Sequence, residues 1–389
     1  YKVAICEQLT EPQKGKMVER DVVRVITPGT VIEDTILEES KNNYIMSIYK
    51  LGEILSVCYA DITTGEFNVE TFKDKIDNSL TDTLTRVMPK EVIGNNEAKE
   101  IYLSLQIQKL GILPRFTPYF DWAFGYDRCD KNLKSQFGDN YSKVFDLDND
   151  KIAKICCGVL IEYLNETQKR MMSNINKINI IRNKDFLMLD PNTKRNLELT
   201  ESIRERKKYG SLLWLLDKTK TSMGARKMRK IFDEPLRVAK TINERLNSVE
   251  EIVKKIILRD RLSEVLSKVN DIERLSGKIA YGNINPKDLL SLKKSLEVLP
   301  DLKQVLNETS TLFKYAEKIA DFEQIRDLLE RAIKEDAPYI TREGGFIKDG
   351  FNTELDSLRS MKKDGNSYKD AMENNEREKT GIANLKIGY

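Results

Sequence analysis

The chain has 389 residues, with 65 Lys and Arg side chains against 62 Asp and Glu side chains, and it contains no histidine. The missing histidine excludes Ser-His-Asp and Cys-His catalysis, histidine proton transfer and histidine-containing metal sites within this chain. Apolar residues make up 40% and charged residues 33% of the sequence. This composition favours about two to four domains with much exposed helix surface.

Cysteine usage and hydropathy indicate the cellular compartment. The five cysteines are Cys6, Cys58, Cys129, Cys156 and Cys157. Their odd number, one adjacent pair and lack of a C-x-x-C spacing favour reduced, packed thiols in a cytoplasmic protein over a disulfide framework or a zinc site. No apolar run approaches the roughly 18 residues that span a bilayer, so no membrane association is expected. The start at Tyr1, without Met or signal-peptide features, suggests a piece of a longer protein.

The first 150 residues contain the strand-like segments. Apolar or alternating runs predict strands at residues 3–6, 22–26, 44–49, 54–62, 66–72 and 91–94. Turn residues separate the third, fourth and fifth of these runs, which predicts an antiparallel meander. A helix is expected at 78–88, so residues from about 44 onwards should form an α/β domain of about 100 residues.

The later part of the chain has helical periodicity. Helices are predicted at residues 152–163, 211–216, from Ser222 to the break at Pro235, and at 238–255, 259–281, 286–298, 312–335 and 354–379. Many of these segments are polar on most faces, as in helices that bridge between modules. An extended all-α assembly is therefore expected.

Charge is distributed unevenly along the chain. Residues 44–150 carry 12 basic and 17 acidic side chains, whereas residues 151–232 carry 19 basic and 8 acidic ones. A concentrated positive segment can attract a polyanion through counterion release. The same charges can instead form the solvated outer faces of helices or ion pairs within the protein.

Several short segments are weak signals alone but specific when taken in order. They are Tyr1–Gln8 (YKVAICEQ), Val22–Thr30 (VVRVITPGT), Leu189–Leu199 (LDPNTKRNLEL), Leu216–Thr219 (LDKT), Thr221–Arg226 (TSMGAR), Asp271–Leu275 (DIERL), Gly344–Ile347 (GGFI) and Glu376–Gly381 (EREKTG). With these segments at plausible separations, the chain resembles the MutS family of DNA mismatch-repair proteins along essentially its whole length.

The resemblance implies an α+β multidomain fold. Residues 1–35 would be the C-terminal tail of the mismatch-binding domain, and residues 36–149 a ribonuclease-H-like α/β connector domain. Residues 150–353 would be an extended all-α core and lever region, and residues 354–389 the start of a helical DNA clamp arm.

The resemblance also implies partners and cofactors. The full-length protein would bind mismatched double-stranded DNA, form a homodimer and dock a MutL-type partner through the connector domain, in the bacterial cytoplasm at the nucleoid. ATP and Mg would belong to an ATPase domain of that full-length protein. The family's Phe-x-Glu mismatch wedge would precede the segment that matches Tyr1, and no G-x-x-x-x-G-K-[ST] loop occurs in this sequence. No catalytic residue, cofactor or metal ligand is therefore assigned within these 389 residues, and the chain itself is expected not to be an enzyme.

Four cations are candidate contacts to the DNA backbone. Arg20 and Lys16 lie in the segment that, by resemblance, runs beside the mismatch domain, and Lys362 and Lys363 lie in the clamp arm. Cations at these positions would neutralise phosphates without reading sequence. The alternative is ordinary surface charge, because acidic residues flank Arg20 and interleave with the clamp lysines.

Seven residues inside the family-like segments are expected to have structural or allosteric roles. They are Asp190, Arg195, Asp217, Met223, Gly224, Arg226 and Arg274. The arginines lie near acidic and apolar residues, so ion pairs at helix junctions are favoured over DNA contact. Gly224 is expected to let two helices approach closely.

Two other readings remain open. A ribonuclease-H-like domain could be a metal-dependent nuclease, but Asp61 is the only obvious strand carboxylate, since Glu53, Glu66 and Glu70 fit turn or solvent-facing positions. A two-metal site needs several clustered carboxylates. A MutS-family branch outside mismatch correction is the second alternative, and the Tyr1–Gln8 and Val22–Thr30 segments argue against it.

Overall fold

The computed structural model describes residues 2–10, 17–105, 114–182 and 186–386. The chain forms two compact units, each described by itself below. The first contains Tyr1–Ile284 and Val298–Ala320, and the second contains Asn285–Glu297 and Asp321–Tyr389.

The first unit begins with a two-stranded antiparallel hairpin of β1 (Val3–Gln8) and β2 (Arg20–Ile26). Arg24 ties this hairpin to the rest of the unit, because its guanidinium donates to Gln168 at 3.0 Å and to Glu33 at 2.9 Å. The hairpin therefore has a charged, buried connection at its base.

A six-stranded mixed sheet follows, in the order β7-β6-β3-β4-β5-β8. The strands are β3 (Tyr44–Leu51), β4 (Ile54–Asp61), β5 (Glu66–Phe72), β6 (Glu91–Gly94), β7 (Phe116–Pro118) and β8 (Asn179–Ile180). The predicted meander is confirmed, since β3, β4 and β5 pair antiparallel, while β6, β7 and β8 each join in parallel.

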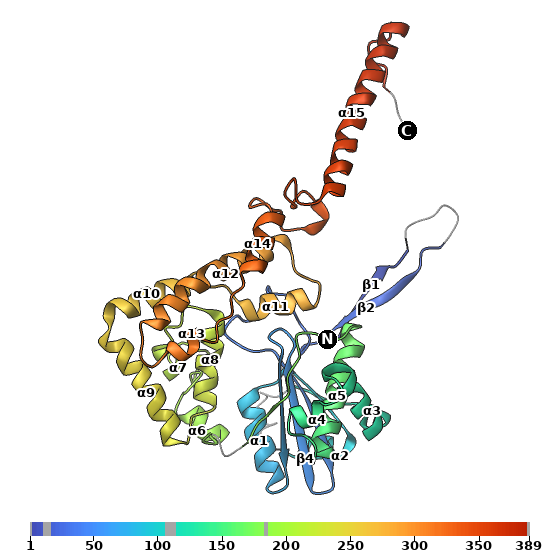
Figure 1. Ribbon diagram of the computed structural model, residues 1–389. Coiled ribbons are helices and arrows are strands. Elements are labelled where there is room, and N and C mark those ends of the chain that lie inside the picture. Colours follow the sequence, from blue (N-terminus) through green and yellow to red (C-terminus); the bar gives the residue numbers. More distant parts are fainter. Residues whose placement is uncertain (1, 11–16, 106–113, 183–185, 387–389) are drawn as a thin grey trace. The chain divides into compact units, whose positions relative to one another are not determined.

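Helices cover both faces of this sheet (Figure 1). The helical segments around it are α1 (Ile76–Val87), α2 (Asn96–Ser104), η2 (Asp121–Phe124), α3 (Tyr126–Phe137), α4 (Tyr141–Val144) and α5 (Lys151–Gln168). Side chains of β4 alternate between two apolar cores, because successive residues of a strand point to opposite faces. Leu55 and Val57 pack with α1 and α2, whereas Cys58 and Ala60 pack with α3 and α5.

Helix α5 corrects the expected boundary at residues 149 and 150. It packs on β3, β4 and β5 and along α3, and most of its side chains are buried in the sheet's own core. At Gly158 an added Cβ would lie 2.4 Å from Cys129 Cβ, so the two helices touch there. Periodicity identified the helix but not the surface that it covers, and residues 151–168 belong to the sheet domain.

The rest of the first unit is helical. Its helices are α6 (Pro191–Asn196), α7 (Leu212–Leu216), α8 (Ser222–Asp233), α9 (Ala239–Lys254), α10 (Ile256–Ser267), α11 (Ile272–Ala280) and α13 (Phe313–Ala316). The single helix predicted over 259–281 is wrong, because Asp271 caps a new helix by accepting from the backbone N–H of Arg274.

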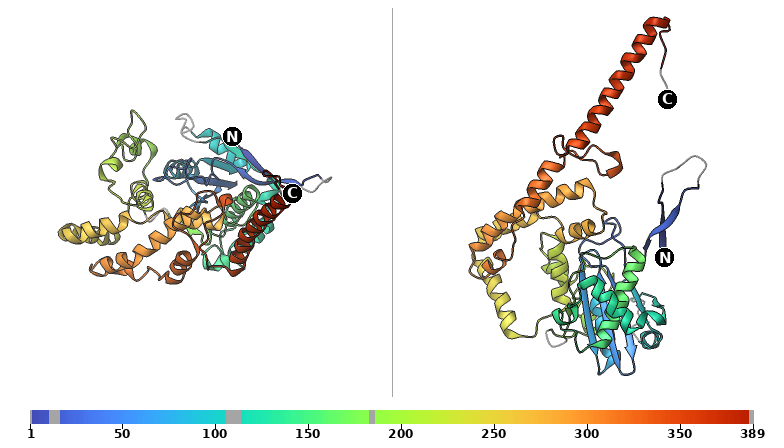
Figure 2. Two further views of the ribbon diagram at one scale, coloured as in Figure 1. Left: turned by 90° about the horizontal axis from the view of Figure 1, so that it is seen from above. Right: turned by 45° about the vertical axis from the view of Figure 1, so that its right-hand side comes forward.

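The second unit contains α14 (Glu323–Ala332), η3 (Thr341–Glu343) and α15 (Thr353–Thr380), together with the first part of α12 (Pro286–Asn307). The helix predicted over 312–335 is therefore divided between α13 and α14. Asn352 caps the start of α15 and Gly381 its end. Figure 2 shows α15 as one unbroken helix. Among the described residues, no helix is both long and apolar enough to cross a membrane.

Candidate functional site

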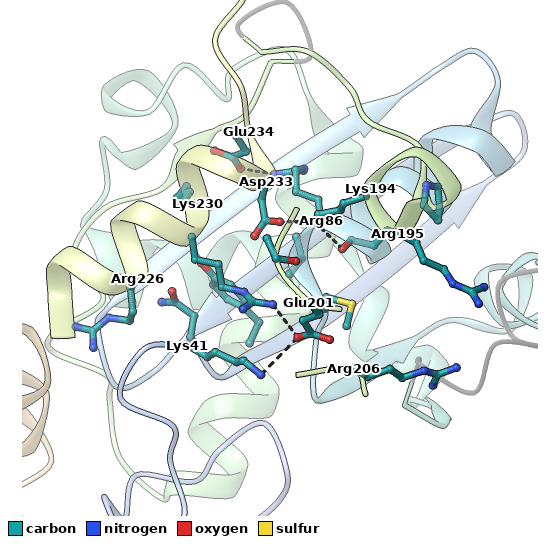
Figure 3. Close-up of a pocket in the computed structure, with 18 of the residues that line it drawn as sticks. Lys41, Arg86, Lys194, Arg195, Glu201, Arg206, Arg226, Lys230, Asp233 and Glu234 are labelled. Atoms are coloured by element: carbon teal, nitrogen blue, oxygen red, sulfur yellow. Dashed lines mark hydrogen bonds and ion pairs between the residues drawn. The ribbon is translucent and has the colours of Figure 1, made fainter. Parts of the chain in front are cut away.

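A cavity of about 300 Å³ lies within the first unit, where the sheet domain meets the following helices. One side comes from the start of β3 and the end of α1, and the other from α6, the loop after it and α8 (Figure 3). We call this cavity the junction pocket. Nine of its lining residues are cationic: Lys41, Arg86, Lys90, Lys194, Arg195, Arg206, Arg226, Arg229 and Lys230.

Local sequence explains why α6 and α8 carry these cations into the pocket. Asp190 caps α6 by accepting from the backbone N–H groups of Asn192 and Thr193, and proline occupies the first helical position. Thr221 caps α8 in the same way. Along α8 the pocket-lining charged residues recur at spacings of three and four, so they share one face of the helix.

A buried ion-pair network joins the sheet domain to the end of α8. Arg86 of α1 pairs with Glu70 of β5 and, at 2.7 Å, with Glu234 just after α8. Its guanidinium also donates to the Tyr59 hydroxyl at 3.1 Å. Burial raises the pKa of Glu70 although the Arg86 charge lowers it. The guanidinium therefore offsets part of the cost of burying the Glu70 carboxylate, although the pKa of Glu70 stays above its ordinary value.

Two further pairs cross the same junction. Lys194 of α6 pairs with Asp233 of α8 and donates to the Thr85 carbonyl at the end of α1 at 3.3 Å. Lys230 donates to Glu66 of β5 at 2.5 Å. Burial alone would raise the pKa of Glu66, but the charge and hydrogen bond of Lys230 lower it below its ordinary value. The sheet domain and α8 are thus held by charges that compensate one another.

Arg226 lies near the start of α8 and is buried. Its guanidinium donates to Asp271 at 2.6 and 2.8 Å and to Glu273 at 2.7 Å, and its side chain is 4% exposed. Arg274 is also buried and donates to the carbonyls of Glu38 and Lys41. Arg226 therefore forms ion pairs with the start of α11, and Arg274 forms hydrogen bonds with backbone carbonyls before β3, all within the first unit.

The other predicted structural residues lie in different places. Asp190 is the cap of α6, and Arg195 is exposed at the pocket. Asp217 accepts from Lys208 and Thr219; burial alone would raise its pKa, but these hydrogen bonds lower it. Met223 lines a separate shallow pocket beside α11.

The expectation for Gly224 is corrected. An added Cβ would meet Thr221 Oγ1 at 2.9 Å and Thr219 Cβ at 3.3 Å, both in the turn that starts α8, rather than another helix. The glycine at which two helices approach closely is Gly158, where α5 meets α3, and Gly277 of α11 instead approaches the turn after β4, where a Cβ would lie 2.4 Å from the Thr63 carbonyl oxygen.

None of the candidate DNA-contacting cations is among the described residues that line the junction pocket. Arg20 is exposed at the start of β2, and Lys362 is exposed on α15 in the second unit. Lys16 lies outside the described residues, as does the side chain of Lys363. The structure therefore does not bring these four into one described site.

The strand carboxylates Asp61, Glu66 and Glu70 have hydrogen-bond or ion-pair partners within the protein. Asp61 is fully buried, and its carboxylate accepts hydrogen bonds from Asn42, the Asn43 backbone and Thr63. Glu70 was expected to face solvent and is instead 1% exposed, because the α1 layer covers its face of the sheet. Within the described residues no group of three or more acidic or cysteine side chains could hold a metal ion.

Sequence reasoning missed the central members of the junction. Arg86, Glu70 and Glu234 are separated by 16 and 148 residues along the chain, so no local spacing connects them. One signal was available: Glu70 interrupts a strand in which Phe67, Val69 and Phe72 already supply apolar residues to both faces. A charge in a strand covered on both sides requires a buried partner.

Known protein families and relatives match almost the whole length of the chain. Models of MutS domain I, domain II and domain III match residues 1–35, 43–176 and 192–385, respectively. The domain II match includes α5, in agreement with the packing of this helix on the sheet. The DNA mismatch repair protein MutS of Alkaliphilus oremlandii is 41% identical over 402 residues, covering 100% of this chain and 45% of the relative. That of Clostridium beijerinckii is 42% identical over 392 residues, covering 100% of this chain and 41% of the relative.

The fold and the site together define a multidomain protein in which a mixed-sheet domain is joined to a helical region by buried ion pairs. Three consecutive domain matches and about 40% identity over the whole chain establish its relationship. The chain belongs to the MutS family. It spans less than half of the length of the relatives named above.

Proposed function

We propose that this chain acts in DNA mismatch repair as the part that couples mismatched-DNA binding to an ATP-driven conformational change. The ordered match to three MutS domains carries this proposal. ATP and Mg are bound in the full-length protein, outside these 389 residues, and the full-length protein is a DNA-dependent ATPase.

The junction supports a coupling role because ion pairs with largely buried side chains connect α8 to β5 and α1. Movement of α8 would act directly on β5 and α1 through Glu66, Glu70 and Arg86. Conformational coupling requires elements that have discrete packings rather than a continuously deformable interface. In this proposal the helices after residue 186 act as levers, and the sheet domain passes their movement to the DNA-binding hairpin.

The proposed domain roles follow the family. The strand order, with a central antiparallel meander extended by parallel strands, supports a ribonuclease-H-like connector. In this proposal the connector docks a MutL-type partner, α15 begins the clamp arm, and the full-length protein is a homodimer of the bacterial cytoplasm, associated with the nucleoid. Arg20 and Lys362 contact DNA phosphates, with Lys16 and Lys363 as further candidates.

The test is DNA binding by the chain itself. Fluorescence anisotropy with a G·T heteroduplex and its matched homoduplex should show salt-dependent binding of both, with less than about tenfold preference for the mismatch, because phosphate contacts carry no sequence information. Arg20→Glu and Lys362→Glu should each weaken binding several-fold, whereas the control Arg259→Glu, at an exposed residue of α10, should not. A mismatch preference above tenfold, or ATP hydrolysis by the chain, would contradict the proposal.

Neither alternative is favoured. A nuclease would need carboxylates free to bind divalent ions, and the hydrogen bonds to Asp61 leave that carboxylate satisfied. Metal-dependent cleavage of DNA or RNA that is lost in Asp61→Ala would reverse this judgement. A family branch without a mismatch domain is disfavoured by the domain I match over residues 1–35.

A further inference from the structure

Part of the lining of the junction pocket is apolar. Tyr44, Val87, Met88 and Ile203 line it, and Met88 and Ile203 remain 37% and 44% exposed. Met88 ends α1 in a left-handed conformation, with φ of 51°. A bulky side chain is uncommon in the left-handed region of backbone conformation, and adopting this conformation costs free energy. The result is an accessible apolar surface inside a concave site.

Three cations at the pocket have no ion-pair partner among the described residues: Lys90, Arg195 and Arg206. They differ from the other six lining cations, each of which is paired with a carboxylate. Figure 3 shows Arg195 and Arg206 at the same edge of the pocket. Arg206 is also left-handed, with φ of 52°, and its N–H donates to the Ser202 carbonyl.

The charge balance of the pocket therefore favours an anion. The carboxylates at the junction are already used by Arg86, Lys194, Lys230 and their neighbours, so they do not neutralise the three remaining cations. Nine cations and three carboxylates, Glu201, Asp233 and Glu234, line the pocket, and a concave site with an excess of one sign of charge concentrates ligands of the opposite sign. Guanidinium groups bind phosphate through paired, charge-assisted hydrogen bonds.

We propose that the junction pocket binds a small phosphorylated molecule with a flat apolar body, of which a nucleoside monophosphate is the simplest example. Its phosphate would lie against Lys90, Arg195 and Arg206, and its apolar body against Met88 and Ile203. A cavity of about 300 Å³ is at the lower end of the size range of small-molecule sites. The pocket is thus too small for a duplex but large enough for such a ligand.

Isothermal titration calorimetry with AMP, inorganic phosphate and adenosine as separate probes tests this proposal. AMP should bind saturably below about 10 mM, and each of the other two should bind at least about tenfold more weakly, because each uses only one part of the pocket. The double variant Arg195→Gln and Arg206→Gln should weaken AMP binding by about tenfold or more, as expected for the loss of charge-assisted hydrogen bonds.

A matched control is available in the same loop. Arg204 and Lys207 are exposed like Arg206 but do not line the pocket, so Arg204→Gln with Lys207→Gln removes the same charge and should leave AMP affinity unchanged. Ile203→Glu should weaken AMP binding without unfolding the chain, which circular dichroism checks. The proposal is overturned if AMP does not bind, if both double variants lose affinity equally, or if phosphate alone binds as tightly as AMP.

Discussion

Replacing Arg86 by methionine should strongly destabilise the first unit. The Arg86 side chain is 6% exposed and pairs with Glu70, which is 1% exposed. Met fills much of the same volume but carries no charge, so the substitution leaves a buried carboxylate without a cation. Breaking a buried pair in this way typically costs about 3–5 kcal/mol of the free energy of unfolding.

Protonation of Glu70 sets an upper limit on that cost. A carboxyl group with an ordinary pKa of about 4.3 can be neutralised at pH 7 for about 3.7 kcal/mol. Tyr59 and Thr83 remain within hydrogen-bond distance of the neutral group, at 3.3 Å each. We therefore expect a loss of about 3 kcal/mol at pH 7. At pH 5 the limit falls to about 1 kcal/mol, so the penalty should shrink on acidification.

Urea unfolding followed by tryptophan fluorescence measures this change. The chain has two tryptophans, and both Trp122 and Trp214 lie in the first unit, so the signal reports that unit alone. Lys254→Met, which removes one member of an exposed pair with Glu250, is the control and should leave the urea midpoint unchanged. A loss below about 1 kcal/mol at pH 7, or a loss that is the same at pH 5, would refute the reasoning.

Two further outcomes are expected. Because the folded-state pKa of Glu66 is lowered, its pair with Lys230 stabilises the fold above the ordinary glutamate pKa of about 4.3 and loses that effect as pH falls through the folded value. The stability difference between wild type and Glu66→Gln, measured by urea titrations, should therefore shrink as the pH is lowered below about 4.3. A difference that is independent of pH would contradict the assignment. Gly277→Ala places a Cβ 2.4 Å from a backbone oxygen and should lower the free energy of unfolding by about 1–3 kcal/mol. The control Gly365→Ala, whose Cβ has nothing within 4 Å, should not lower the melting temperature measured by circular dichroism. Equal effects of the two variants would exclude a steric cause.

Local pattern was sufficient for most of the secondary structure. Alternation and turn residues predicted β3, β4 and β5 within one or two residues, and the capping residues Ser211 and Thr221 mark the starts of α7 and α8. These features depend on neighbours a few residues apart, whose physical chemistry can be read directly along the chain. The breaks between α10 and α11 and between α13 and α14 were missed, because apolar periodicity continues across both of them.

The sequence by itself also determined the family, the absence of histidine chemistry and the excess of positive charge in residues 151–232. Only the tertiary structure decided where that charge is used. Arg226 and Lys230 are neutralised by carboxylates from distant segments, whereas Arg195 and Arg206 remain unpaired at a pocket in the described part of the chain. The reason is physical: burial makes a charge costly unless a partner arrives through the fold, and that partner can be any residue that the packing brings within about 3 Å.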